Sequence, residues 1–140
     1  MDLDGPLRAR ASLKVERPPT MWEADTQTEP FLLLLGELIA LGLGRGNRLE
    51  ELTLNVSNVV VEPDRDDGGS IPEGEFVAIS VRGAGSWDDD TWRPGTEPAT
   101  GSLRELTSAA ADAGAVYAYS RNLGAEGSVT VFLPRLPEPR

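Results

Sequence analysis

Apolar and polar residues alternate along several stretches of the chain. Successive side chains of a strand point to opposite faces of a sheet, so a period of two is typical of a strand with one buried face. The alternation predicts strands at 7–15, 52–61, 77–81, 116–119 and 129–133. Segment 63–73 is acidic and rich in Gly, and it predicts the connection of one hairpin. Gly124-Ala-Glu-Gly127 predicts the turn of another.

Two other stretches have the period of a helix. Apolar residues recur every three to four positions over 31–41, which is typical of a helix with one face on a core. Thr26-Gln-Thr-Glu29 fits a capping box at its start, and glycines follow its end. A second capping box, Ser102-Leu-Arg-Glu105, predicts a helix that runs through Ala113 and ends at Gly114.

The order of these elements predicts an α+β fold. We expect a two-layer α/β sandwich, with both helices on one face of a mixed, mostly antiparallel sheet. Segments 1–6 and 135–140 are predicted to be a flexible N-terminus and a disordered, proline-rich tail around one domain at 7–134. Segment 87–98 is predicted to be a loop without regular structure. The predicted core combines inward residues of the helices and strands: Leu34, Leu38, Leu106, Ala110, Leu54, Val56, Val77, Ile79, Val81, Val116 and Val131.

Composition excludes several classes of function. The net charge of −10 argues against a partner with phosphates, and so against nucleic acid and an anionic membrane. The chain has no Cys and no His, so it lacks thiolate metal ligands and the commonest general base. Its most apolar run, 31–44, is shorter than the roughly 20 residues that a bilayer span needs. No signal pattern opens the chain, which predicts a cytoplasmic protein.

Four phrases of the sequence stand in an order and spacing found in one known family. They are Met21-Trp22, the strand from Arg48 to Val59, the strand Ile71-Pro-Glu-Gly-Glu-Phe-Val-Ala-Ile-Ser-Val81, and the closing hairpin from Gly114 to Pro134. Together they resemble the catalytic ATP-binding domain of bacterial sensor histidine kinases, in the Bergerat-fold ATPase superfamily. The resemblance implies a histidine kinase ATPase-like fold with a pocket for ATP and Mg²⁺.

The sequence departs from the family where the family's chemistry lies. Glu37 and Leu41 stand at the two asparagine positions of the first helix, and a leucine cannot ligate Mg²⁺. Gly83 replaces the aspartate that binds adenine, while Gly85 keeps a glycine of the same box. Gly101 is what remains of the glycine-rich box that wraps the phosphates. We expect these five residues to mark a degenerate pocket, although Glu37 could still be a metal ligand rather than a helix-surface residue.

Two functions of different classes follow from this resemblance. The first is a regulatory or protein-binding module in two-component signalling, whose partner is a response regulator or a histidine-containing domain. The alternative is a domain that still binds ATP or another small ligand. A remnant without a present role is a third possibility. No phosphorylatable histidine is present, so we expect neither autonomous kinase activity nor a catalytic or metal-binding residue.

Segment 87–98 contains the residues that best fit a protein-binding surface. Aromatic anchors are typical of binding hot spots, and an acidic run favours a basic partner. The candidate residues are Trp87, Asp88, Asp89, Asp90 and Trp92. Two other interpretations stay open, because the tryptophans could fill the vacated pocket, where Trp87 replaces a second glycine, and the acidic run could hold a metal or simply be solvated.

Overall fold

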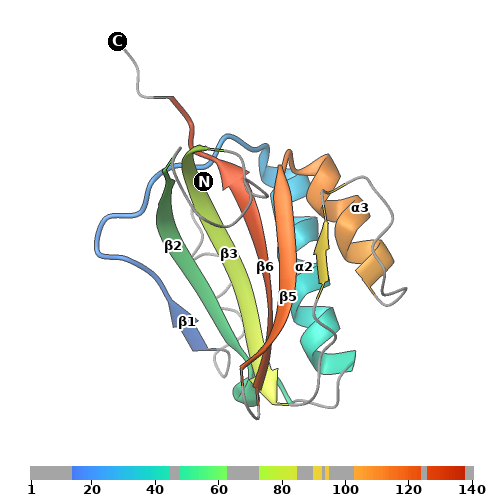
Figure 1. The fold of residues 1–140 in the computed structure, drawn as a ribbon. Coiled ribbons are helices and arrows are strands. Elements are labelled where there is room, and N and C mark those ends of the chain that lie inside the picture. Colours follow the sequence, from blue (N-terminus) through green and yellow to red (C-terminus); the bar gives the residue numbers. More distant parts are fainter. Residues whose placement is uncertain are drawn as a thin grey trace.

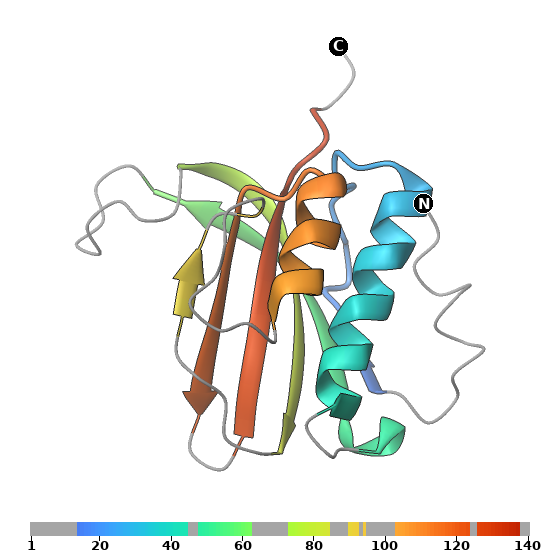
Figure 2. The same ribbon diagram turned by 90° about the vertical axis from the view of Figure 1, so that its right-hand side faces the viewer.

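The strands of the chain form one mixed sheet, and both helices lie on the same face of it (Figure 1). The protein is therefore an α+β fold. Seen from the side, α2 and α3 run next to each other, and no described helix lies on the opposite face of the sheet (Figure 2). This computed structural model describes residues 14–44, 48–62, 73–84, 90–92, 94, 103–123 and 126–137.

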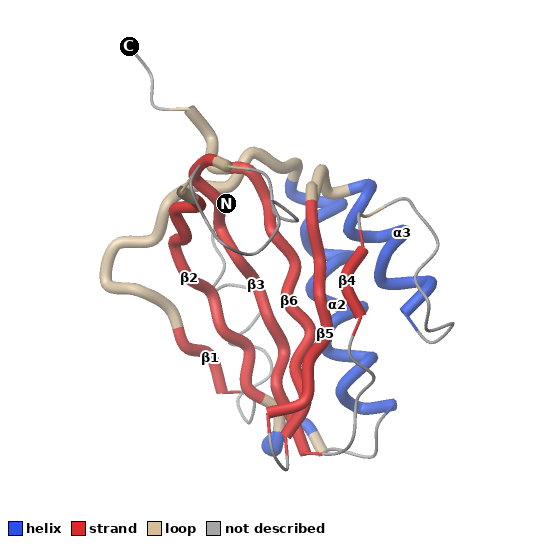
Figure 3. The backbone as a smooth tube through the Cα atoms, in the orientation of Figure 1, coloured by secondary structure: helices blue, strands red, loops and turns tan. Residues whose placement is uncertain are grey.

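The sheet has six strands in the order β1-β2-β3-β6-β5-β4 (Figure 3). Strand β1 pairs in parallel with β2, and all other neighbours are antiparallel. The elements are β1 (Lys14–Glu16), α2 (Thr28–Gly44), the 3₁₀ turn η1 (Leu49–Glu51), β2 (Thr53–Val61), β3 (Gly74–Ala84), β4 (Asp90–Trp92), α3 (Arg104–Asp112), β5 (Tyr117–Leu123) and β6 (Glu126–Pro134).

Both predicted hairpins are present, since β2 pairs with β3 and β5 pairs with β6. The predicted first strand, 7–15, is confirmed at 14–15, which belong to β1, and positions 7–13 lie outside the described residues. One strand prediction needs correction. The predicted loop 87–98 contains a strand, β4, which forms by pairing with β5. Three residues are too few to show an alternating pattern, so the sequence did not reveal β4.

The main core lies between the sheet and the two helices. Of the predicted core residues, all but Val116 belong to it. Phe31, Leu34, Leu35 and Leu38 face inward from α2, as the helical period predicts, while Leu106 and Ala110 do so from α3. Val116 is wrongly predicted, because it is half-buried and packs against a second cluster.

The second cluster brings together apolar residues of β2, β3, β5 and β6 whose side chains alternate with those of the main core. Its rings form tilted and edge-on pairs, with the ring centres of Phe76 and Phe132 and of Tyr117 and Phe132 each 5.9 Å apart. Such pairs contribute beyond the apolar area that they bury. The buried members are Val61, Phe76, Ala78, Tyr117 and Phe132.

A tertiary contact changes the predicted start of α2. Helix α2 begins at Thr28, and the Thr26 hydroxyl donates to the carbonyl oxygen of Ala113 at 2.8 Å. Thr26 thus ties the start of α2 to the end of α3. Helix α3 is preceded by Leu103, which makes no side-chain cap hydrogen bond, and Ser102 lies outside the described residues. The predicted end of α3 is confirmed, because Gly114 has φ +88° and only glycine adopts this conformation readily.

Candidate functional site

Helix α2 and strand β3 finish at the same end of the sheet (Figure 1). Leu41 lies in the last turn of α2 and Gly83 next to the last residue of β3, while Glu37 lies in the middle of α2. Glu37 is half-buried, and the partly buried side chain of Leu41 packs against the main core. Gly83 is buried in the ladder opposite Gly127. Gly85 and Gly101 lie outside the described residues.

Close apolar packing marks this end of α2. A Cβ atom added to Gly42 would lie 2.6 Å from Cδ2 of Leu52, a fully buried side chain. The helix therefore presses directly on Leu52 where its last turns meet the sheet. Leu41 and Gly83 bring no polar side-chain atom to this region, so neither could hold Mg²⁺ or accept a hydrogen bond from adenine.

The predicted protein-binding residues are only partly described. Trp87, Asp88 and Asp89 lie outside the described residues. The backbones of Asp90 and Trp92 belong to β4, where Asp90 lies opposite Ser120 and Trp92 opposite Ala118. Strand β4 is the last strand of the sheet order, so it forms one of the sheet's two edges.

A hollow of about 430 Å³ lies at the other end of α2, around its first turn. The segment before α2 and the first turns of that helix form its walls, while β2 and β3 supply an apolar floor. Thr26, Thr28 and Glu23 add the polar groups. The lining residues are Met21, Trp22, Glu23, Ala24, Thr26, Thr28, Phe31, Val56, Val77 and Ile79. The floor is closed, because Val56, Val77 and Ile79 are at most 2% exposed.

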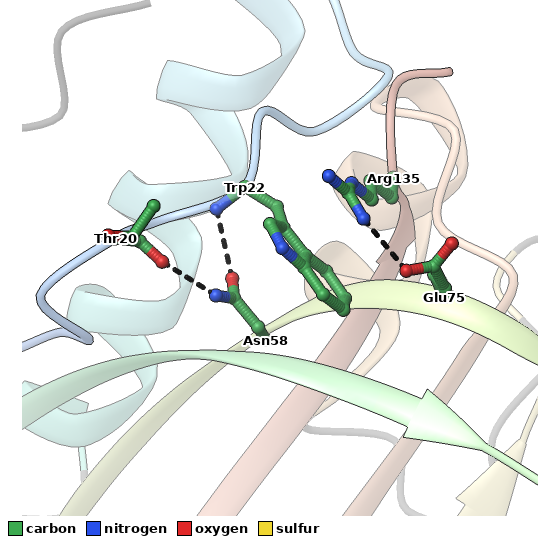
Figure 4. Close-up of polar contacts among 5 residues, drawn as sticks. All are labelled: Thr20, Trp22, Asn58, Glu75 and Arg135. Carbon is green, nitrogen blue, oxygen red and sulfur yellow. Dashed lines mark hydrogen bonds and ion pairs between the residues drawn. The ribbon is translucent and has the colours of Figure 1, made fainter. Parts of the chain in front are cut away.

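Asn58 of β2 fixes the segment that walls the hollow (Figure 4). Its side-chain oxygen accepts from the backbone N–H of Trp22 at 3.0 Å, and its amide donates to the carbonyl oxygen of Thr20 at 2.7 Å. Alternation with Leu54 and Val56 places Asn58 on the core side of the strand. The sequence signal for this contact was a polar residue, Asn58, on the apolar face of a strand. We did not predict the contact.

The chain after β6 holds the same segment from its other side. The guanidinium carbon of Arg135 lies 4.2 Å from the ring centre of Trp22, and its Nη1 lies 2.8 Å from Oε2 of Glu75 (Figure 4). The backbone N–H of Leu136 donates to the carbonyl oxygen of Glu23 at 2.7 Å. The ordered chain therefore extends to Leu136, beyond the predicted domain boundary at residue 134.

Glu23 is the only charged residue among the described residues that line the hollow. Among the described residues, no three acidic side chains come close enough together to hold a metal ion. Neither described helix is long and apolar enough to cross a membrane. The apolar floor of the hollow and the few polar groups of its walls suit non-covalent binding of a molecule.

Comparison with known proteins gives no further assignment: no protein-family profile matches the chain, and no curated protein is significantly similar to it in sequence.

Proposed function

We propose that this chain is a catalytically inactive relative of the histidine kinase ATP-binding domain. In this proposal it acts as a regulatory, protein-binding module in two-component signalling. The topology is consistent with the sandwich that the sequence resemblance implies, because the sheet is mixed and carries both helices on one face. The partner would be a response regulator or a histidine-containing domain.

The packing at the end of α2 supports the claim that the chain is catalytically inactive. Leu41 packs against the core, and Gly83 has no side chain with which to bind adenine. In a functional site these two positions would bind the metal and the base. A buried polar group left without its partner costs about 1–3 kcal/mol, and two such losses add to one another. The chain is therefore expected to bind ATP weakly.

Calorimetry of the purified chain with ATP and Mg²⁺ tests this expectation. We expect no saturable binding at submillimolar nucleotide. A micromolar isotherm that disappears in a folded Gly83→Val variant would contradict the proposal. It would instead support a domain that retains ATP as its ligand.

The protein-binding half of the proposal concerns segment 87–98. Strand β4 places Asp90 and Trp92 on an edge of the sheet, and edge strands are common sites of pairing with other chains. We expect Trp92 to be an anchor and Asp88, Asp89 and Asp90 to make association sensitive to salt, because exposed charges are screened.

A pull-down with the intact chain and with Trp92→Ala tests that surface. The intact chain is expected to recover a signalling protein that the folded variant loses. Recovery of the same proteins by both, or of none by either, would remove this segment as the interface. A circular dichroism melt of each variant separates a lost interface from a lost fold.

The hollow supports a second candidate function, the binding of a small molecule other than ATP. Its volume of about 430 Å³ lies within the range of ligand pockets in proteins. A ligand of the native state raises its melting temperature by mass action. A compound that binds here should stabilise the intact chain but not Thr28→Arg, in which a long side chain enters the hollow from its wall. Equal stabilisation of both proteins would place the compound elsewhere.

A further inference from the structure

Helix α2 is apolar on the side that faces away from the sheet. Its outward residues include three leucines, of which Leu33 is 60% exposed, Leu43 is 40% exposed and Leu32 is 39% exposed. Gly36 and Ala40 lie exposed between them. We call these five residues the outer stripe: Leu32, Leu33, Gly36, Ala40 and Leu43.

A helix that covers one face of a sheet normally carries polar residues on its other face. The inner side of α2 already supplies the core, with Phe31, Leu34, Leu35 and Leu38 all buried. The outer stripe does not contribute to that packing. Contiguous exposed apolar residues of this kind are typical of surfaces that bind another molecule.

The outer stripe has the shape of a docking surface for a helix. Positions 33, 36, 40 and 43 follow the three- and four-residue steps that align side chains along one side of a helix. Leu33 and Leu43 stand at the two ends, and the small residues Gly36 and Ala40 lie between them. A Cβ atom added to Gly36 would have no atom within 4 Å, so the middle of the stripe is open. A partner's large side chain can enter there.

The charges around the outer stripe restrict the chemistry of the partner. Glu29 and Glu37 are the only charged residues of α2, and the chain as a whole has a net charge of −10. A partner with basic residues beside its apolar side chains would be complementary to this surface. A membrane fits less well, because helices that lie on membranes usually carry Lys and Arg on their polar side.

We propose that the outer stripe docks an amphipathic helix of another protein, whose apolar face is flanked by Lys or Arg. This inference rests on the proposed function only in that the chain acts by binding a protein. It concerns a different surface from segment 87–98. The 17 residues of α2 span about 25 Å, which gives a partner helix of similar length room to lie along it.

The test uses the full chain and a fluorescent synthetic peptide of about 18 residues, helical in pattern, with leucines on one face and lysines beside them. The chain variant Leu33→Gln/Leu43→Gln keeps the net charge and removes apolar surface. We expect it to weaken peptide binding about tenfold or more, as the loss of anchor residues does. The matched control Ser108→Gln, on the exposed side of α3, should bind like the intact chain.

The charge part of the proposal has its own variant. Glu29→Gln/Glu37→Gln should weaken binding severalfold and flatten its dependence on salt, because two complementary charges are removed. Equal affinity of the intact chain and of Leu33→Gln/Leu43→Gln would overturn the proposal, since binding would then be electrostatic attraction at any surface. Absence of saturable binding to the intact chain would overturn it too. The single variant Leu33→Gln repeats the test if the double variant fails to fold.

Three further results would assign the stripe to another occupant and overturn the proposal. Sedimentation could find a dimer of the chain that Leu33→Gln separates. Phosphatidylcholine vesicles could bind the intact chain but not Leu33→Gln. Replacement of Arg8 and Arg10 by Gln could raise peptide affinity, which would mean that the chain's own first residues compete. The two proposals can fail separately. If Trp92→Ala loses signalling partners while Leu33→Gln/Leu43→Gln binds the peptide like the intact chain, the proposed function stands and this inference does not.

Discussion

The two helices cover the same face of the sheet but differ in what they present outward. In α3 the outward residues Arg104, Glu105, Ser108 and Asp112 are polar, and the buried ones are Leu106, Thr107 and Ala110. In α2 leucines lie on both sides. Packing on α2 and on the core between helices and sheet explains the whole pattern of α3, whereas it explains only the inner half of α2. The difference indicates that α2 has a second packing surface that the described fold does not use.

The sharpest contrast within α2 is between its two sets of leucines. Leu38→Ala should lower the free energy of unfolding by about 2–5 kcal/mol, because it leaves a cavity in the core around a fully buried side chain. Leu33→Ala should change it by only about 0.5 kcal/mol or less, since the side chain is largely exposed. Urea denaturation of both variants measures the difference. Equal losses would mean that the outer stripe is already part of a core.

Two glycines of α2, Gly36 and Gly42, offer a smaller contrast of the same kind. Gly36→Ala should raise the free energy of unfolding by up to about 1 kcal/mol, because alanine favours the helix and meets no neighbour. Gly42→Ala gains the same helix propensity but forces the buried Leu52 side chain to move, and overpacking of a core costs about 1–3 kcal/mol. We therefore expect Gly42→Ala to leave the chain less stable than Gly36→Ala in thermal or chemical unfolding. Equal stabilisation by both variants would contradict the close contact between α2 and Leu52.

The smallest expected change in stability concerns the hydrogen bond that joins the start of α2 to the end of α3. Thr26→Val removes the hydroxyl that donates to the Ala113 carbonyl oxygen while keeping the shape of the side chain. The loss should be about 1 kcal/mol, as for a typical intramolecular hydrogen bond. Thr28→Val is the matched control, because Thr28 is an exposed threonine in the first turn of α2. Losses of equal size would mean that the hydrogen bond from Thr26 to Ala113 adds nothing to stability.

The hydrophobic period of the sequence predicts the long strands and the inner faces of both helices. The alternation of Leu54 and Val56 on β2, and of Val77 and Ile79 on β3, leads directly to the core side of both strands. Strand β4 escaped prediction because only its pairing with β5 makes it a strand. The capping box at Thr26 failed as a helix start, because the Thr26 hydroxyl donates to a residue 87 positions away. Ser102 of the second box lies outside the described residues.

The hollow was harder to predict than the fold. Its wall is fixed by Asn58, Glu75 and Arg135, which are distant from Trp22 in sequence and meet only in the folded chain. No periodic pattern encodes such a meeting. The resemblance directed attention to Leu41 and Gly83 instead, and the degenerate pocket that it implies there stays a prediction.

The most direct test of the contrast between the helices is an NMR titration of the full chain with the leucine–lysine peptide. Backbone amide and leucine methyl signals of α2 report on the outer stripe, and those of Glu105, Ser108 and Asp112 report on the exposed side of α3. We predict saturable shifts at Leu32, Leu33 and Leu43, with the signals of α3 unchanged. Shifts of equal size on both helices, or shifts confined to α3, would contradict the proposal that, of the two helices, only α2 presents a docking surface.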